Sequence, residues 1–311
     1  MLQAQSIPIY KVYTYEVDVV LMFTYLIPCK NNNELLEETL ESIDIECADI
    51  KKILLVDDYS EVPINDSIKF QHPKLSIIRN REESGIVGAL NFGLKHVNTD
   101  YVLRLDSDDL DLPCRIKFTK EAINNFKDAD IISFGKLDFP GDRATNVHWR
   151  SRKELAALLA FGNPIYHPTV CIKTSVFKKI QYSNGLNSDR QAAKGAEDYL
   201  LWCKAFLAGF RMYNYPYIVI KYRVWDGQVS RERNAKDPAY TVAKWFQAHI
   251  EQQPILTLAD FIKSYRNNKG QLYGDGSGDF TITAVKRRFG NTNGVAAIFW
   301  FLVYLFIRFL K

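Results

Sequence analysis

The sequence predicts an α/β fold: a doubly wound, mostly parallel sheet flanked by helices, with a C-terminal helical extension. Two observations carry this prediction. Short apolar or β-branched runs alternate with segments of helical periodicity, as parallel strands joined by crossover helices require. Acidic residues directly follow several of these runs, and ligands of open α/β sheets lie beyond the carboxyl ends of the strands. We therefore expect a polar site at one edge of the sheet.

The first part of the chain supplies the repeating strand–helix units. Strands are expected at 17–27, 52–56, 75–79, 101–105 and 131–134, and helices at 33–45, 85–97 and 115–126. Asn31 and Asn33 offer side-chain oxygens that can cap the first helix. The order of elements and the short connections between them indicate a nucleotide-binding half of the doubly wound type.

The pattern changes after about residue 140. Helices are expected at 151–161 and 197–209, strands at 169–173 and 217–222, and a polar, glycine-bounded loop at 183–195. A further helix-rich tail is expected from about Tyr240, with residues 268–279 as a linker inside it.

These patterns divide the chain into a main α/β domain and an extension. The main domain is expected over residues 17–235, with a first half at 17–115 and a second half at 116–235. The helical extension is expected over 236–311.

The extension ends in thirteen consecutive apolar residues, 295–307. A spanning helix needs about 20 apolar residues, so this run is short for a transmembrane segment, and a buried core helix is the alternative. The aromatic content of the run, with Arg308 and Lys311 after it, suits the interface of an anionic membrane. We therefore expect 295–311 to associate with the inner face of the cell membrane.

Composition narrows the class of protein. A net charge of +4 is mild and does not indicate a nucleic-acid partner. Five scattered cysteines without a Cys-x-x-Cys pair argue against a disulfide framework and a structural zinc site. Glu16 and Asp18 interrupt the N-terminal region before its apolar run, so no secretion signal is expected. A cytoplasmic location follows.

The run 101–105 ends in three carboxylates within four residues, Asp106, Asp108 and Asp109. Clustered carboxylates repel one another and are costly to desolvate, so packing does not explain them. A divalent cation removes this conflict, and oxygen ligands suit Mg²⁺ or Mn²⁺. The stretch therefore predicts a site for a metal-bound anionic substrate.

Three further polar groups stand at expected strand ends or helix starts. Pro28 and its neighbours leave the first strand, Asp57 and Asp58 leave the second, and Glu197 and Asp198 open a helix. Carboxylates at a helix N-terminus also have a plain role as partners of the helix dipole. Because these groups and the acid cluster are all expected at the same edge of the sheet, a role in a functional site is favoured.

The ordered motifs resemble those of family 2 glycosyltransferases, a nucleotide-sugar-dependent group of the GT-A fold that builds polysaccharides and lipid-linked glycans. The resemblance covers roughly residues 17–230, and it implies that 17–235 is the catalytic domain, with a nucleotide-sugar half at 17–115 and an acceptor half at 116–235. Its motifs are Ile27-Pro28, Val56-Asp57-Asp58, Asn80, Gly85, Ala89–Leu94, Tyr101–Arg115, Asn163–Val170, Glu197-Asp198, Trp202, Tyr222-Arg223 and Ser230. Each motif is weak by itself, and the ordered set is specific.

The resemblance implies a metal-dependent, inverting transfer of a hexose or N-acetylhexosamine from a UDP-sugar to a hydroxyl of a glycan or lipid-linked saccharide. Asp58 would accept a hydrogen bond from the uracil ring, and Pro28 would pack beside it. Asp106 and Asp108 would meet the ribose and a Mn²⁺ or Mg²⁺ ion that bridges the diphosphate. Asp198 would be the general base.

The other site residues divide between donor and acceptor. On the donor side the resemblance adds Gly85, Asn91 and Arg104, and Arg104 either pairs with the acid cluster or holds the diphosphate. The acceptor side is expected to comprise Asp109, His167, Glu197 and Trp202. Trp225 stands where many members carry a His that can reach the metal, so the metal is expected to rely on the acid cluster and the substrate.

Two alternative functions share part of this pattern. A sugar-nucleotide nucleotidylyltransferase would carry a glycine-rich basic loop after the first strand, where this chain has Pro-Cys-Lys-Asn-Asn at 28–32. A non-catalytic carbohydrate-binding relative would not need Asp106, Asp108 and Asp198 intact. The identity of the sugar, the acceptor, the linkage and the oligomeric state stay open at this point.

Overall fold

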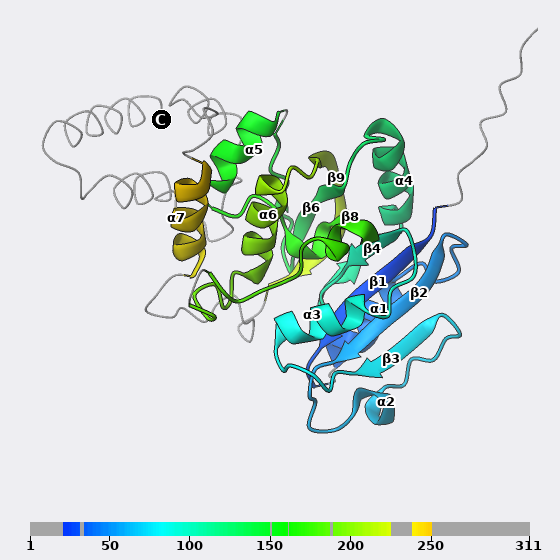
Figure 1. The fold of residues 1–311 in the computed structure, drawn as a ribbon. Helices are drawn as coiled ribbons and strands as arrows, with labels where there is room; N and C mark the ends of the chain where they lie inside the picture. The colour runs from blue at the N-terminus through cyan, green and yellow to red at the C-terminus, as the bar shows by residue number, and fades with distance from the viewer. Residues whose placement is uncertain are drawn as a thin grey trace, which may run out of the picture.

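The computed structural model describes residues 21–31, 34–149, 151–160, 162–186, 189–224 and 238–250. One nine-stranded sheet runs through this part of the chain, and helices cover both of its faces (Figure 1). The predicted α/β class is therefore confirmed.

The first four strands form a parallel half-sheet in the order β3-β2-β1-β4. The strands are β1 (Phe23–Cys29), β2 (Ile50–Asp57), β3 (Leu75–Arg79) and β4 (Tyr101–Arg104), and the connecting helices are α1 (Glu34–Ser42), α2 (Ile64–Ser67) and α3 (Ile86–Leu94). Because all four strands are parallel, their carboxyl ends meet at one edge of the sheet.

The second half of the sheet is mixed. Its strands are β5 (Leu110–Asp111), β6 (Ile131–Phe139), β7 (Ala144–Thr145), β8 (Cys171–Lys173) and β9 (Met212–Arg223). Strand β8 is antiparallel to both β4 and β6, whereas β9 is parallel to β6. Strands β7 and β5 pair antiparallel with β6 and β9. The parallel arrangement expected from the sequence is thus complete only in the first half.

Only five residues, 105–109, separate β4 from β5, although β8, β6 and β9 lie between these two strands in the sheet. A five-residue segment spans at most about 17 Å. The sheet must therefore curl so that its second half approaches the end of β4. We call residues 105–109 the acid loop.

The remaining helices pack around this curled half. They are α4 (Arg115–Asn125), α5 (Arg152–Leu159), α6 (Glu197–Leu207) and α7 (Pro238–Ile250), with two 3-10 turns, η1 (His167–Thr169) and η2 (Thr174–Lys178). Helices α6 and α7 contact each other through Phe206 and Phe246, whose ring centroids are 5.6 Å apart.

Alternate side chains of β1 pack into two hydrophobic cores on opposite faces of the sheet. Tyr25 and Ile27 share one core with the apolar face of α1, and Leu26 shares the other with α3. Helix α3 lies very close to the sheet, because a Cβ at Gly93 would be 2.6 Å from Leu26 Cδ1 and 2.7 Å from Val56 Cγ2. The first half is therefore a tightly packed platform for the strand ends.

Most of the elements expected from the sequence are present. Strand 75–79 has its predicted bounds, whereas β6 and β9 extend well beyond 131–134 and 217–222. The short elements α2, β5 and β7 were not predicted. The division of the catalytic domain into two halves stays a prediction.

Several expectations lie outside the described residues. They concern the start of the first strand before residue 21, Trp225, the linker 268–279 and the apolar segment 295–311. Within the described ranges, no helix has the length and apolar content that crossing a membrane requires.

Candidate active site

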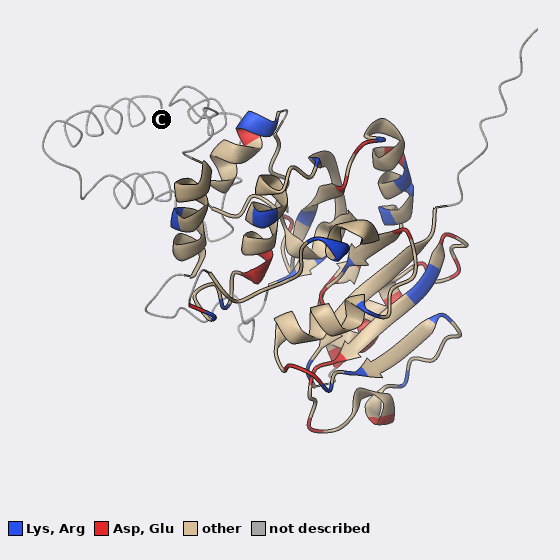
Figure 2. Ribbon diagram, viewed as in Figure 1, with Lys and Arg blue, Asp and Glu red and all other residues tan. Residues whose placement is uncertain are grey.

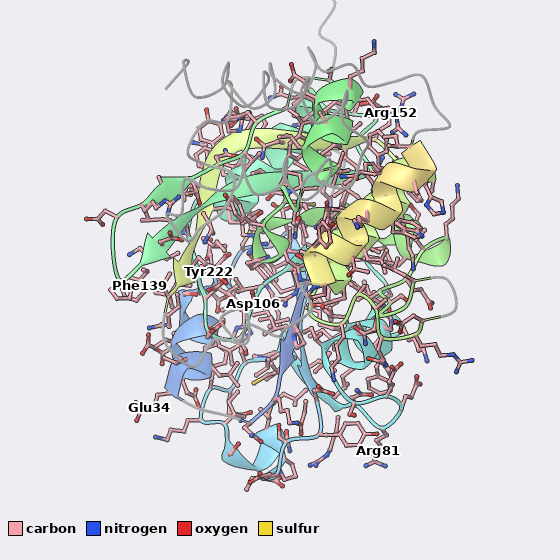
Figure 3. All side chains as sticks on the ribbon, turned by 90° about the vertical axis from the view of Figure 1, so that its left-hand side faces the viewer. Glu34, Arg81, Asp106, Phe139, Arg152 and Tyr222 are labelled. Carbon is pink, nitrogen blue, oxygen red and sulfur yellow. The ribbon has the colours of Figure 1, made fainter. Side chains whose placement is uncertain are left out.

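The polar groups predicted to form a site follow the carboxyl ends of β1, β2 and β4. At this edge Cys29 of β1 pairs with Asp57 of β2, and Leu26 of β1 pairs with Arg104 of β4. Figure 3 looks onto this side and shows Asp106 near its middle, with Tyr222 of β9 close to it in the view. The parallel topology therefore brings these groups together.

Asp58 joins the end of β2 to the start of α3. Its backbone N–H donates to the Cys29 carbonyl at 2.8 Å. Its carboxylate accepts from Gly85 N at 2.9 and 3.1 Å and from Asn80 Nδ2 at 3.1 Å. Gly85 has a φ of 97°, a conformation that glycine adopts readily. Two of these donors share Oδ1, so Oδ2 keeps room for one more donor.

Asp57, the neighbour of Asp58, has a structural role. Its side chain is buried and accepts from Ser60 N at 2.9 Å and from Ile64 N at 3.3 Å. Arg79 lies 3.7 Å from the same carboxylate. Pro28, predicted to pack beside a base, is buried within β1.

Arg104 and Asp106 form an ion pair, with 2.5 Å between Nη2 and Oδ1. The Arg104 side chain is 3% exposed, and that of Asp106 is 32% exposed. Burial is the largest single influence and lowers the pKa of the Arg104 guanidinium, but the charge and hydrogen bond of Asp106, with the charges of Tyr182 and Asp109, together outweigh it and raise that pKa. Of the two roles left open for Arg104, pairing with the acid cluster is the one present.

Two nitrogen atoms of Arg104, Nε and Nη1, are buried and have no hydrogen-bond partner among the described residues. Buried guanidinium donors of this kind are costly unless an acceptor satisfies them. Arg104 thus carries two unsatisfied buried donors directly before the acid loop.

Asp109 is the last residue of the acid loop, and its side chain is fully buried. Its Oδ1 accepts from Arg223 N at 2.8 Å, and its Oδ2 has no partner among the described residues. Burial raises the pKa of this carboxyl well above its ordinary value, and the charges of Asp106 and Asp108 raise it further. The prediction that Asp109 faces an acceptor is therefore wrong, because its side chain does not reach the surface.

Arg223 ties the end of β9 to the acid loop. Besides the contact with Asp109, its Nε donates to the Asp108 carbonyl at 2.7 Å, and its Nη2 lies 2.5 Å from Glu38 Oε2 on α1. The motif Tyr222-Arg223 predicts that Arg223 lies near the site but does not predict its role. A cationic residue at the end of a strand is the sequence signal that could have indicated a partner for the acid cluster.

Glu197 and Asp198 are the first two residues of α6, and Figure 2 shows the red of acidic residues at this end of the helix. Asp198 Oδ2 accepts from Asn163 Nδ2 at 2.7 Å, and Oδ1 accepts from Tyr199 N at 2.6 Å. These two donors orient the carboxylate without occupying all of its acceptor positions.

The pKa values of both carboxyls are raised. Burial and then the charge of Asp198 raise the pKa of Glu197 to about 7, and burial raises the pKa of Asp198. The charges of Asp106 and Arg104 act on both groups, the first raising and the second lowering their pKa values. The start of α6 is therefore an electrostatic neighbour of the acid loop.

His167 is the buried neighbour of this pair. Its Nε2 lies 2.8 Å from the Tyr182 hydroxyl, and its ring meets the Trp202 ring edge-on with centroids 5.9 Å apart. Burial and then the charge of Arg104 hold the pKa of His167 well below its usual range. His167 is thus a neutral hydrogen-bonding group at neutral pH.

Two predicted contacts with substrate are wrong. Trp202 is fully buried, so its ring cannot stack on a sugar as expected. Asn91 uses both ends of its amide on the backbone of Tyr182, with Nδ2 to the carbonyl at 3.0 Å and Oδ1 to the N–H at 3.1 Å. Its role is to fasten α3 to the Tyr182 segment.

The acid loop fits the chemistry of a divalent cation. Asp106 and Asp108 are partly exposed carboxylates on one short loop. In the described ranges, no group of three or more His, Cys, Asp or Glu side chains is placed to hold a metal ion. Mg²⁺ is commonly bound by one or two protein carboxylates together with phosphate oxygens and water, and two loop carboxylates match that pattern.

Comparisons with known proteins show the family of the chain. The family model described as glycosyl transferase family 2 matches residues 24–180, about half of the chain. An uncharacterized glycosyltransferase of Haemophilus influenzae is 29% identical over 221 residues, covering 69% of this chain and 78% of the relative.

A second relative carries a specific name. The UDP-Gal:alpha-D-GlcNAc-diphosphoundecaprenol beta-1,3-galactosyltransferase of Escherichia coli is 24% identical over 249 residues, covering 78% of this chain and 86% of the relative. Among solved structures, S. aureus TarS 1-349 in complex with UDP-GlcNAc matches with a TM-score of 0.58 and 16% identity. That match covers 86% of this chain and 80% of TarS 1-349, and it confirms the GT-A fold.

Proposed function

We propose that this chain, which belongs to glycosyl transferase family 2, moves a hexose or N-acetylhexosamine from a UDP-sugar to a hydroxyl of a glycan or lipid-linked saccharide. The observation that carries the proposal is the placement of Asp198. Its oriented carboxylate lies at the start of α6, in electrostatic contact with Arg104 and the acid loop. A base beside a diphosphate site is the arrangement that glycosyl transfer needs.

At the donor end, Asp58 supplies the contact to the base. Its Oδ2 has capacity for one more hydrogen bond, which the imide N–H of uracil would donate. Because Gly85 and Asn80 already hold the carboxylate, it is pre-oriented and loses little freedom on binding.

At the diphosphate, Asp106 and Asp108 would hold a Mn²⁺ or Mg²⁺ ion, which when bound supplies positive charge to the leaving nucleoside diphosphate. Arg104 adds a buried positive charge beside Asp106. Its Nε and Nη1 groups are buried, so Arg104 does not reach the donor directly. In this proposal it acts through its charge and through its ion pair with Asp106.

At the acceptor end, Asp198 removes the proton from the attacking hydroxyl. Its raised pKa makes it a stronger base than an ordinary aspartate, and Asn163 fixes its direction. The acceptor oxygen attacks the anomeric carbon as the bond to the diphosphate breaks. A single displacement of this kind inverts the anomeric configuration, so an α-linked donor gives a β-linked product.

The acceptor class and the location complete the proposal. The name of the Escherichia coli relative specifies a diphosphoundecaprenol-linked acceptor, which favours a lipid-linked saccharide here. The apolar run at 295–311 favours a place on the inner face of the membrane.

A donor screen tests the proposal. Purified protein is incubated with UDP-glucose, UDP-galactose and their N-acetyl forms, with Mn²⁺, Mg²⁺ or EDTA, and released UDP is measured. We expect release from one donor class with the metals and none with EDTA. Asp108→Ala should abolish UDP binding, and Asp142→Ala, an exposed aspartate in the β6–β7 turn, should not. Metal-independent turnover, or no UDP-sugar bound, would reject the assignment.

A further inference from the structure

We infer that Arg115 is a positioning residue that holds both ends of the acid loop and the turn that carries His167. Arg115 lies at the start of α4 and is fully buried, so it cannot touch a substrate itself. Its guanidinium instead contacts three separate segments of the chain.

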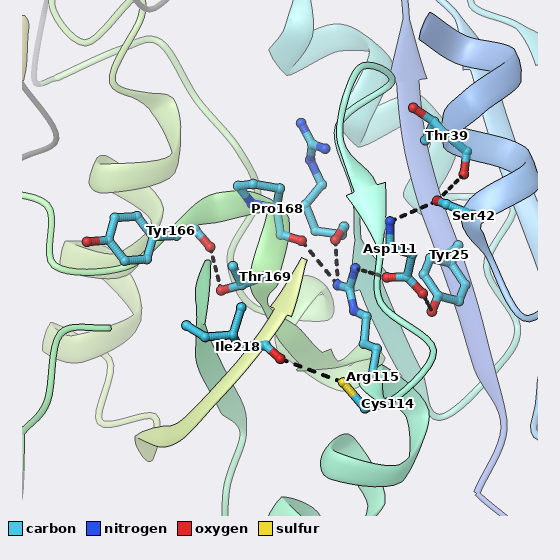
Figure 4. Close-up of polar contacts among 11 residues, drawn as sticks. Tyr25, Thr39, Ser42, Asp111, Cys114, Arg115, Tyr166, Pro168, Thr169 and Ile218 are labelled. Carbon is cyan, nitrogen blue, oxygen red and sulfur yellow. Dashed lines mark hydrogen bonds and ion pairs between the residues drawn. The ribbon is translucent and has the colours of Figure 1, made fainter. Parts of the chain in front are cut away.

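The contacts are drawn in Figure 4. Nη1 donates to Asp111 Oδ1 at 2.9 Å. Nη2 donates to the Arg104 carbonyl at 2.6 Å and to the Pro168 carbonyl at 3.2 Å. Arg104 precedes the acid loop, Asp111 follows it, and Pro168 directly follows His167. One side chain thus links the donor side and the acceptor side of the site.

Asp111 extends this link to β1 and α1. Its Oδ2 accepts from the Tyr25 hydroxyl at 2.7 Å, and its backbone N–H donates to Ser42 Oγ at 2.8 Å. Ser42 in turn donates to the Thr39 carbonyl at 2.6 Å. The loop end at Asp111 is therefore fastened to the packed first half of the fold.

The geometry needs arginine in particular. A planar guanidinium donates in fixed directions from two terminal nitrogens, so it can serve Asp111 on one side and two carbonyls on the other. A lysine ammonium keeps the charge but is a single donor centre, and it cannot bridge the same span. We therefore expect Arg115→Lys to release at least one end of the loop.

This inference goes beyond the proposed function but rests on it where it concerns catalysis. Loosening residues outside the ligands of a metal site typically weakens metal binding about 10- to 100-fold. If Arg115 positions Asp106 and Asp108, its loss should weaken metal and donor binding more than it slows the chemical step.

The test compares Arg115→Lys with Arg152→Lys. Arg152 on α5 also donates to two backbone carbonyls, those of Phe206 and Phe210, but lies away from the acid loop. Each variant is measured for melting temperature, for the Mn²⁺ concentration at half-maximal activity, and for amide hydrogen exchange. We expect Arg115→Lys to raise the Mn²⁺ requirement about tenfold or more. Arg152→Lys should leave it within about twofold.

Hydrogen exchange gives a readout that needs no substrate. Arg115→Lys should speed exchange in 104–111 and 166–169 together, while Arg152→Lys should not. If the two variants match in exchange at these segments and in Mn²⁺ requirement, the positioning role is overturned. Should wild-type protein show no metal-dependent transfer while exchange still responds, the proposed function fails and the positioning role stands.

If Arg115→Lys does not fold, a milder variant tests the positioning role. Ser42→Ala removes one hydrogen bond to Asp111 and leaves the buried ion pair in place. We expect it to speed exchange in 104–111 and to raise the Mn²⁺ requirement by a smaller factor in the same direction. Unchanged exchange and an unchanged Mn²⁺ requirement would overturn the inference.

Discussion

Arg104 Nη2 and Asp106 Oδ1 lie 2.5 Å apart at the end of β4, with the arginine buried and the aspartate partly exposed. The pair places a positive charge inside a group of carboxylates that would otherwise repel one another. It also leaves Arg104 Nε and Nη1 without partners among the described residues. This one side chain therefore both stabilises the acid loop and places a positive charge beside the proposed diphosphate site.

Replacing Arg104 by methionine tests this dual role. Without the guanidinium, the charges of Asp106 and Asp108 are uncompensated and Asp106 loses its ion-pair partner. We expect UDP-sugar affinity to fall by about 10- to 100-fold, because losing a hydrogen bond to a charged group costs about 1.5–3 kcal/mol and here leaves Asp106 unpositioned. Isothermal titration with UDP and Mn²⁺ measures it. The exposed Arg81 provides the control, Arg81→Met, which should bind normally; equal affinities in both variants would remove Arg104 from the donor site.

Asn163 is predicted to act through Asp198. Its amide holds Asp198 Oδ2 at 2.7 Å, so Asn163→Ala should leave the base misdirected but ionisable. We expect kcat to fall about 10- to 100-fold, with the donor KM nearly unchanged, because the base loses its orientation but not the whole of the roughly 100- to 10,000-fold contribution of general base catalysis. Steady-state kinetics give both constants. Asn125→Ala, on α4, is the matched control because it loses only a bond to the Tyr215 hydroxyl. A change in KM alone would contradict the role.

Glu197 should make stability depend on pH. Its pKa is raised from 4.5 to about 7 in the folded protein, so the native state binds more protons than the unfolded state between these values. Its contribution to stability is therefore complete below about pH 4.5 and is lost as pH rises through about 7.

Glu197→Gln removes this proton linkage. The free energy of unfolding, measured with urea at pH 5 and at pH 8, should fall between these pH values in wild type. The fall should be smaller in the variant, by up to about 3 kcal/mol. Glu41→Gln, at an exposed position of α1, should behave as wild type. An identical pH dependence in Glu197→Gln and wild type would show that Glu197 titrates normally.

The apolar C-terminal segment gives a prediction about location. Deleting residues 295–311 should move the protein from the membrane fraction to the soluble fraction, because the aromatic and basic residues there suit a membrane interface. Fractionation of cells followed by immunoblotting measures the distribution. Persistent membrane association of the shortened chain would reject an anchoring role for this segment.

The sequence predicted the parallel half-sheet and the clustering of Asp58, Asp106 and Asp198, because strand periodicity and acidic strand ends are local signals. It did not predict the mixed second half, where strand order is decided by contacts between distant segments. The two-residue strand β5 has too few residues to show a periodicity.

Side-chain burial was the other feature that the sequence could not supply. Asp109 and Trp202 belong to motifs with polar or aromatic chemistry, yet both are buried, and Asn91 is used by the backbone of Tyr182. Motif membership identified residues near the site without distinguishing those that face a ligand from those that support it. Arg115 belongs to the supporting group.

The central claim is that Asp198 is the base that deprotonates the acceptor, and Asp198→Asn tests it most directly. The amide keeps the size of the side chain but cannot take a proton. Donor binding and transfer are measured separately, by titration with UDP-sugar and Mn²⁺ and by acceptor glycosylation. We use Asp100→Asn as the control, since Asp100 is exposed and lies before β4. The account predicts normal donor binding with transfer reduced about 100-fold or more; near-wild-type transfer by Asp198→Asn would contradict it.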